Sequence, residues 1–206
     1  MKKQILHLTN MKNLRILISS ILLSGLFFAC QETEKLPVLG PPGHTIPDFE
    51  LINQDSLAFG TKNLEGKIFV VDFFFTTCPT ICPIMKTQLL RVYKKYHDDD
   101  NLRLVSISID PDFDQPAVLK DFTKKLNIDT NFWTFLTGDQ EYIFNLGEKN
   151  FLVTTQKDDK ELGGYLHSGA LILIDTNRQI RGIYDGTKED EVNELIRDIK
   201  RVKSEE

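Results

Sequence analysis

The chain has 206 residues, of which 41% are hydrophobic and 27% are charged, and its formal net charge is −5. That length is sufficient for one domain with a sizeable core. An acidic chain with no basic stripe argues against nucleic acid as a partner, because phosphate backbones are bound by clustered Lys and Arg.

The N-terminus is typical of an export signal. Lys12 and Arg15 precede an apolar stretch, 16–29, that is too short to span a bilayer but fits a signal-peptide core. Cys30 follows a small residue, which resembles the bacterial lipoprotein processing site. We therefore predict a lipoprotein-type signal peptide over 1–29 and an exported protein, lipid-anchored through Cys30 to a membrane and facing the periplasm or the cell exterior. The alternatives left open are a non-cleaved anchor and an ordinary signal with a chance cysteine.

The segment after the signal peptide is rich in proline and glycine. This composition predicts a flexible tether over residues 30–46, between the lipid and the folded part of the chain. We expect the remainder, residues 47–206, to form a single domain.

Within this domain, apolar periodicity changes repeatedly between the strand and the helix pattern. In chain order it predicts a hairpin (49–52 and 56–59), a buried strand (68–75), a helix (85–96), a strand (102–109), a helix capped by Asp114 (118–126), a strand (132–136), a short helix (141–147), two strands (170–174 and 180–184) and a closing helix (192–202). Asp72 interrupts the first buried strand, and the sequence leaves open whether this carboxylate is buried or lies at a sheet edge.

This order of elements predicts an α/β architecture with a thioredoxin-like fold. We expect a central mixed sheet flanked by helices, with an N-terminal β-hairpin. Right-handed crossovers make the first long strands parallel neighbours. Their carboxyl edge, where ligand sites of α/β proteins lie, would then carry the residues that follow Phe75.

Two of the three cysteines, Cys78 and Cys82, lie at that edge, in the motif Cys-Pro-Thr-Ile-Cys-Pro. If Cys82 lies in the first helical turn, the four-residue step brings both sulfurs to one side. Free backbone amides and the helix dipole would favour thiolate over thiol there. The pair can form a disulfide, exchange electrons or bind a soft metal, and the motif alone leaves these three open.

Three motifs occur in an order that resembles the Sco/SenC family: the cysteine motif, the acidic segment Asp110-Pro111-Asp112-Phe113-Asp114-Gln115-Pro116, and His167-Ser168 before a buried strand. The resemblance covers roughly residues 47–202. Members of this family are thioredoxin-fold proteins that bind copper and help to build the CuA centre of cytochrome c oxidase. The resemblance implies that Cys78, Cys82 and His167 are copper ligands, and that the partner is the oxidase subunit with the CuA site.

The donor set agrees with copper. Two thiolates and one imidazole form a soft site that suits Cu(I) and can also hold Cu(II), whereas structural zinc takes four protein ligands. The chain departs from the family in having Thr80 where many members carry an acid between the cysteines. It also has no proline at 168–170, where thioredoxin-type oxidoreductases carry a cis-proline, and this disfavours a generic reductase.

Two functions compete at this stage. The favoured one is a membrane-tethered copper chaperone that binds one copper ion through Cys78, Cys82 and His167. The alternative is an extracytoplasmic thiol–disulfide oxidoreductase, in which Cys78 and Cys82 are the catalytic redox pair that reduces a metalloprotein partner. Both roles can coexist, because a disulfide cannot bind copper. A peroxide-reducing enzyme is disfavoured, since its Thr-x-x-Cys motif is not evident. The chain is thus better described as a metallochaperone than as an enzyme.

Overall fold

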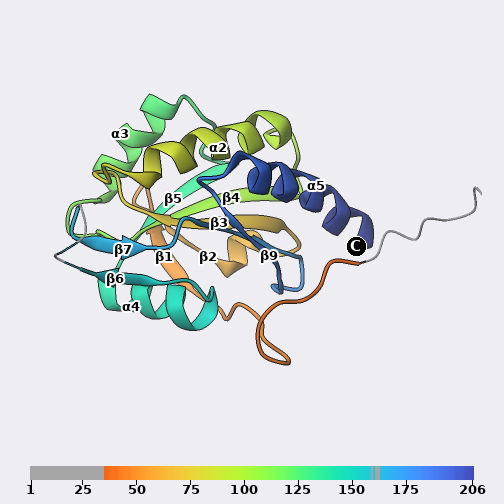
Figure 1. Cartoon of the computed structure of the whole chain (residues 1–206). Helices are drawn as coiled ribbons and strands as arrows, with labels where there is room; N and C mark the ends of the chain where they lie inside the picture. Colours follow the sequence, from red (N-terminus) through yellow and green to blue (C-terminus); the bar gives the residue numbers. More distant parts are fainter. Residues whose placement is uncertain (1–34, 159, 161–162) are drawn as a thin grey trace, which may run out of the picture. The chain divides into compact units, whose positions relative to one another are not determined.

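The central sheet has seven strands in the order β2-β1-β5-β4-β3-β8-β9 (Figure 1). The computed structural model describes residues 35–158, 160 and 163–206, with the backbone alone for Leu166 and His167. The strands are β1 (Glu50–Asn53), β2 (Ala58–Gly60), β3 (Ile68–Phe74), β4 (Leu102–Ser108), β5 (Trp133–Thr137), β8 (Ala170–Ile174) and β9 (Ile180–Asp185). Because β3, β4 and β5 are parallel and the others antiparallel to their neighbours, the sheet is mixed, as predicted.

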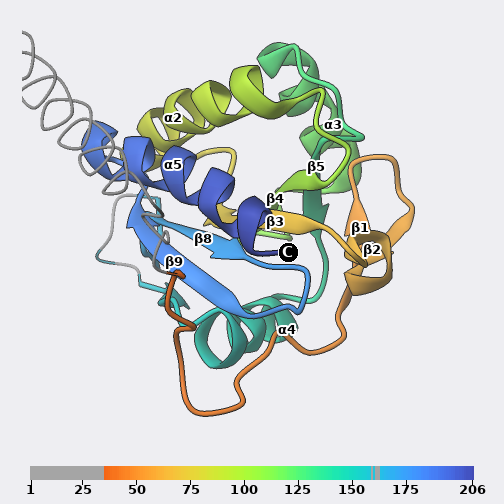
Figure 2. The ribbon, with the colours of Figure 1, turned by 90° about the vertical axis from the view of Figure 1, so that its right-hand side faces the viewer.

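Helices cover both faces of this sheet (Figures 1 and 2). On one face lie α2 (Ile81–Tyr96), α3 (Pro116–Leu126) and α5 (Glu189–Glu205). On the other lies α4 (Gln140–Asn145), which continues into the π-helical turn η3 (Leu146–Asn150), and a 3-10 turn, η2 (Thr61–Leu64), follows β2. Right-handed crossovers between parallel strands put α2 and α3 on the same face. Of the described helices, none combines the length and the hydropathy needed to cross a membrane.

Strand β3 lies inside the sheet between β4 and β8, with helices over both faces, and every one of its residues is buried. Because successive side chains of a strand point to opposite faces, its last two residues enter different layers. Phe73 packs edge-on against Phe151 with ring centroids 5.6 Å apart, and Phe74 packs against Phe135 at 5.3 Å. The loop that leaves the carboxyl end of β3 therefore starts from a point fixed on both sides.

A second sheet was not predicted. It consists of two short antiparallel strands, β6 (Thr155–Lys157) and β7 (Tyr165–His167). His167 ends β7, and its backbone pairs with Thr155. Strands of three residues are too short to show apolar alternation, so the usual strand signal is missing here.

The described part of the predicted tether, residues 35–46, contacts the domain at several points. The backbone of Leu39 pairs with the start of β9, and the side chain of Ile46 is fully buried. Arg181 donates a hydrogen bond to the carbonyl oxygen of Leu36 at 2.6 Å. The prediction of a flexible tether is therefore wrong for 35–46, whose few aliphatic side chains find apolar contacts. The predicted signal peptide and Cys30 lie outside the described residues.

Candidate metal centre

Cys78 lies in the loop after β3, and Cys82 is the second residue of α2, so the condition of a cysteine in the first helical turn is met. Both are nearly buried, with only 7% and 4% of their surface exposed. A hydrogen bond joins the two thiols, and Thr80 Oγ1 lies 3.6 Å from Cys78 Sγ. The two sulfurs are thus neighbours at the carboxyl edge of the sheet, where a disulfide or a soft metal ion can bridge them.

The pKa of the Cys82 thiol is raised from its ordinary value. The hydrogen bond with Cys78 is the largest cause and burial the next, while a backbone hydrogen bond from Phe75 and the charge of Lys86 oppose them. At Cys82, the Cys78 hydrogen bond and burial therefore outweigh the effects that favour the thiolate. A soft cation reverses this balance when it binds, because a coordinating thiol loses its proton.

The loop that carries Cys78 is anchored by Asp114. This carboxylate is completely buried and accepts hydrogen bonds from the backbone N–H and hydroxyl of Thr76 and from the hydroxyl of Ser108. Burial raises its pKa against the lowering effect of those hydrogen bonds. The prediction of Asp114 as a helix cap is wrong, since α3 begins at Pro116 after Gln115. Its partners lie far along the chain, so no local pattern could show them.

The helix that carries Cys82 is tied to the sheet by a buried ion pair. Lys86 Nζ lies 2.6 Å from a carboxylate oxygen of Asp72 and 3.0 Å from Ser106 Oγ, and the lysine side chain is 5% exposed. Ser106 in turn donates to Asp72 and accepts a hydrogen bond from Trp133 Nε1. The open question about Asp72 is thereby answered: it is a buried carboxylate in a central strand. Sequence reasoning missed Lys86.

The β6–β7 hairpin lies against the cysteine loop. A Cβ added to Gly163, in the turn of the hairpin, would lie 2.9 Å from the Phe75 ring and 3.3 Å from Pro79 Cδ. The ring of Tyr165 packs on Phe75 with centroids 5.2 Å apart, and its hydroxyl donates to Asp110 Oδ1 at 2.8 Å. Burial and the Asp110 hydrogen bond raise the pKa of Tyr165 to about 12. The fold thus brings the three predicted motifs to one edge of the sheet.

His167 is located by its backbone alone. It ends β7, and the next residue, Ser168, donates its N–H to the Thr154 carbonyl at 3.1 Å. Its side chain lies outside the described part of the structure, so its role as a ligand stays a prediction. Among the described residues, no three His, Cys, Asp or Glu side chains form a cluster that could hold a metal ion. The described part of the site supplies the two thiols.

Two other histidines lie elsewhere. His44 Nε2 lies 2.8 Å from the carbonyl oxygen of Asn150. His97 follows the last residue of α2, at the opposite end of the helix from Cys82, and is 44% exposed beside Asp98. Neither position suggests a ligand for the cysteine pair.

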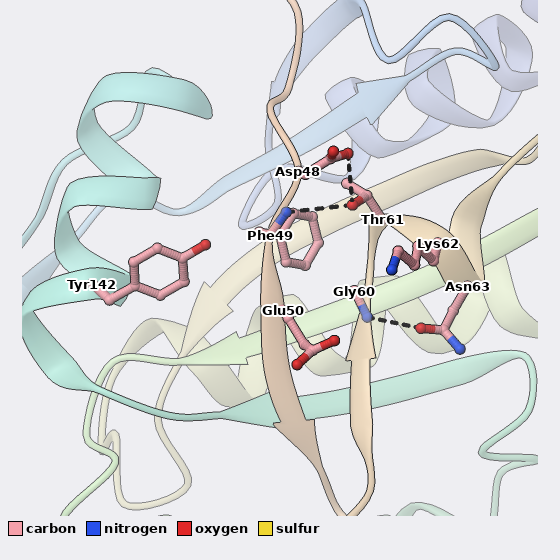
Figure 3. A pocket seen from close by; sticks show the side chains of 8 residues that line it. All are labelled: Asp48, Phe49, Glu50, Gly60, Thr61, Lys62, Asn63 and Tyr142. Carbon is pink, nitrogen blue, oxygen red and sulfur yellow. Dashed lines mark hydrogen bonds between the residues drawn. The ribbon is translucent and has the colours of Figure 1, made fainter.

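A pocket of about 620 Å³ opens between α4 and the β1–β2 hairpin (Figure 3). Its charged lining comes from Asp48, Glu50 and Lys62, and Tyr142 closes one side. The lining contains neither cysteine nor histidine, so it does not offer the soft donors that copper prefers. The cysteine edge remains the candidate metal centre.

Comparison with known proteins gives the same assignment. Residues 39–204 match the SCO1/SenC family model. The fold is similar to that of a SCO1/SenC family lipoprotein from Bacillus anthracis, with a TM-score of 0.72 and 35% identity over 81% of this chain and 99% of that one.

Two further solved structures agree with that match. BsSco, described as having a disulfide switch and as a member of the Sco family of cytochrome c oxidase assembly proteins, gives a TM-score of 0.70 and 27% identity, over 82% of this chain and 99% of that one. Arabidopsis thaliana ScoI with copper bound gives a TM-score of 0.61 and 25% identity, over 75% of this chain and 98% of that one.

Proposed function

The chain belongs to the SCO1/SenC family, and on that basis we propose that it is a membrane-tethered copper chaperone for assembly of the CuA centre of cytochrome c oxidase. The observation that carries the proposal is the pair of nearly buried thiols of Cys78 and Cys82, joined by a hydrogen bond. Copper is the cargo, held by these two sulfurs and by His167. A solved relative with copper bound supports this assignment.

The thiols have to lose their protons when copper arrives. Because the Cys78 hydrogen bond and burial keep Cys82 protonated, copper binding should release protons and weaken as the pH falls. Oxidation of the pair to a disulfide removes two electrons and two protons and leaves no thiolate for the metal. The redox state of Cys78 and Cys82 therefore decides whether the chain can carry copper.

Lipid on Cys30 would hold the protein on the outer side of a membrane, in the periplasm or at the cell exterior. A relative described as a lipoprotein supports this part of the proposal. Ile174 pairs with Phe69 and with Ile180, so Arg181, which binds the Leu36 carbonyl, lies beside the amino end of β3. The chain thus enters the domain at the edge opposite the cysteines, which leaves the copper site open to a recipient protein.

A thiol–disulfide oxidoreductase is the second candidate function. The hydrogen-bonded pair of thiols favours it, since the same two sulfurs could reduce a disulfide in a partner and become oxidised themselves. The chemistry needs Cys78 and Cys82 and does not need His167, so one substitution separates the two functions.

The test is anaerobic copper titration of the full-length protein in detergent. We expect about one copper ion per chain, lost in Cys78→Ser and Cys82→Ser and weakened in His167→Ala. Cys30→Ser is the matched control, because it removes the third cysteine, should keep full copper binding, and should release the protein from the membrane fraction. Equal copper affinity in the wild type and all three site variants would contradict the proposal. Loss of thiol exchange in His167→Ala would contradict the reductase alternative.

A further inference from the structure

We propose that Tyr165 is a positioning residue that holds the β6–β7 hairpin, and with it His167, against the cysteine loop. The inference rests on the proposed copper function for its consequence, and on the described contacts for its geometry. Tyr165 lies two residues before His167 in β7. Its side chain contacts Phe75, which directly precedes the cysteine loop, and Asp110 of the acidic segment.

The hydroxyl of Tyr165 is the polar end of this link. It donates to Asp110 Oδ1 at 2.8 Å and accepts a hydrogen bond from Gln140 Nε2 at 3.3 Å. Gln140 is itself fixed, since the same nitrogen donates to the Ile109 carbonyl at 3.2 Å. Asp110 lies in the segment after β4, and Gln140 is the first residue of α4. The hydroxyl therefore joins β7 to two elements that are distant in sequence.

The ring of Tyr165 is the apolar end. It packs on Phe75, the residue between β3 and the cysteine loop, with centroids 5.2 Å apart. The hairpin turn approaches Phe75 and Pro79 so closely that only a residue without a Cβ fits at Gly163. Gly163 also has a φ of +97°, which favours glycine. The hairpin therefore contacts Phe75 and the cysteine loop at two described positions, Gly163 and Tyr165.

The acidic segment thereby acquires two distinct roles. Asp114 binds Thr76 and fixes the cysteine loop, whereas Asp110 binds Tyr165 and fixes the hairpin. Asp110 is itself held by the donation of its backbone N–H to Ser108 Oγ, a hydroxyl that also donates to Asp114. A rigid connection of this kind lets two loops keep one relative position, which a ligand set drawn from both of them requires.

The first test measures amide hydrogen exchange in the protein without added copper, so that its outcome is independent of metal binding. Tyr165→Phe keeps the ring on Phe75 and removes the hydroxyl. We expect the amides of Asp158 and Ser168, which are bonded at the two ends of the hairpin, to exchange about fivefold faster, as for loss of one hydrogen bond. Tyr142→Phe, at a 40% exposed tyrosine of α4, is the control and should change neither amide.

A second comparison separates the effect of the Tyr165–Asp110 hydrogen bond on exchange from the effect of the Asp110 charge. Asp110→Asn keeps an acceptor for Tyr165 and should behave like the wild type, whereas Asp110→Ala should match Tyr165→Phe. The double variant should be no worse than either single one, because both remove the same bond. If Asp110→Asn matches Asp110→Ala, or if Tyr165→Phe leaves the exchange rates unchanged, the proposal is overturned.

The consequence for the metal is read from the Cu(II) spectrum. With the wild type loaded, electron paramagnetic resonance should show coupling to one imidazole nitrogen together with thiolate-to-copper charge transfer. Tyr165→Phe should reduce the nitrogen coupling and retain the charge transfer. Full nitrogen coupling in Tyr165→Phe would contradict the positioning role, whereas absence of copper in the wild type would contradict the proposed function and leave the exchange test standing.

Discussion

Two buried cations lie toward opposite ends of the central sheet, and they are used differently. Lys86, toward the cysteine end, binds Asp72 within the core, where its ammonium lies 4.0 Å from the centroid of the Phe74 ring. Arg181, at the other end, forms ion pairs with Asp175 and Glu205 and is 8% exposed. Both charges are compensated, as burial demands.

The difference lies in what each cation connects. Lys86 joins α2 to β3 and β4 through one carboxylate and one hydroxyl, a small set that suits a compact ammonium. The planar guanidinium of Arg181 reaches the N-terminal segment at Leu36, the turn at Asp175 and the end of α5 at Glu205. A lysine thus fixes the helix that carries Cys82, and an arginine fixes both ends of the described chain.

The comparison predicts that loss of Lys86 has the larger effect on stability. Lys86→Met keeps an apolar side chain among the aromatic rings but leaves the Asp72 carboxylate buried without its cation, which should cost about 3–5 kcal/mol. Urea unfolding measures this, with the slope of the transition unchanged. Lys86→Met with Asp72→Asn should recover much of the loss, because no uncompensated charge remains. A single variant as stable as the wild type would show that Asp72 finds other compensation.

Loss of Arg181 should cost less, about 2–3 kcal/mol, because its partner carboxylates keep backbone hydrogen bonds: Asp175 from Asn177 and Gln179, and Glu205 from Leu36. Arg181→Met should also speed hydrogen exchange at the Leu39 amide, which pairs with β9, while copper binding at the opposite edge stays unchanged. Arg178→Met is the control: its ion pair with Asp48 is exposed, so the change should be below about 1 kcal/mol. Equal losses in both arginine variants would contradict the distinction.

The buried position of these cations could not be predicted from the sequence, although the elements around them could. The long strand of residues 68–75 and the helix after Pro83 were predicted because their apolar periodicity is strong. Lys86 lies in that helix, and a lysine in a helix is expected in solvent, since lysine is almost never fully buried. Its partner Asp72 is fourteen residues away on another element, so only the folded structure shows the pair.

At the candidate site the same limit applies. Cys78 and Cys82 could be predicted because their chemistry depends on a local spacing. The roles of Asp110, Asp114 and Tyr165 could not, since each acts through a partner on a different loop. The docking of 35–46 was missed for a related reason: a proline- and glycine-rich composition predicts turns and says nothing about the surface that a few aliphatic residues can find.

The smallest effect predicted by the comparison is a difference in pH dependence between the two ends. Burial raises the pKa of Asp114 above its ordinary 3.8, so its contribution to stability is complete below that value and is lost as the pH rises through the folded-state pKa. For Glu205, burial raises the pKa but the Leu36 N–H and Arg181 outweigh it, and the net pKa is lowered from 4.5. Its contribution is complete above 4.5 and is lost as the pH falls.

Acidification should therefore act in opposite directions on the two carboxylates. As the pH is lowered from neutral toward 4, the stability of the wild type relative to Asp114→Asn should increase, and its stability relative to Glu205→Gln should decrease. Urea unfolding of the three proteins across this range measures both differences on one scale. Because the wild type is common to both comparisons, other titrating groups cancel, and only these two carboxylates decide the sign. If both stability differences changed in the same direction with pH, the two ends of the sheet would not differ in the sign of their pH dependence.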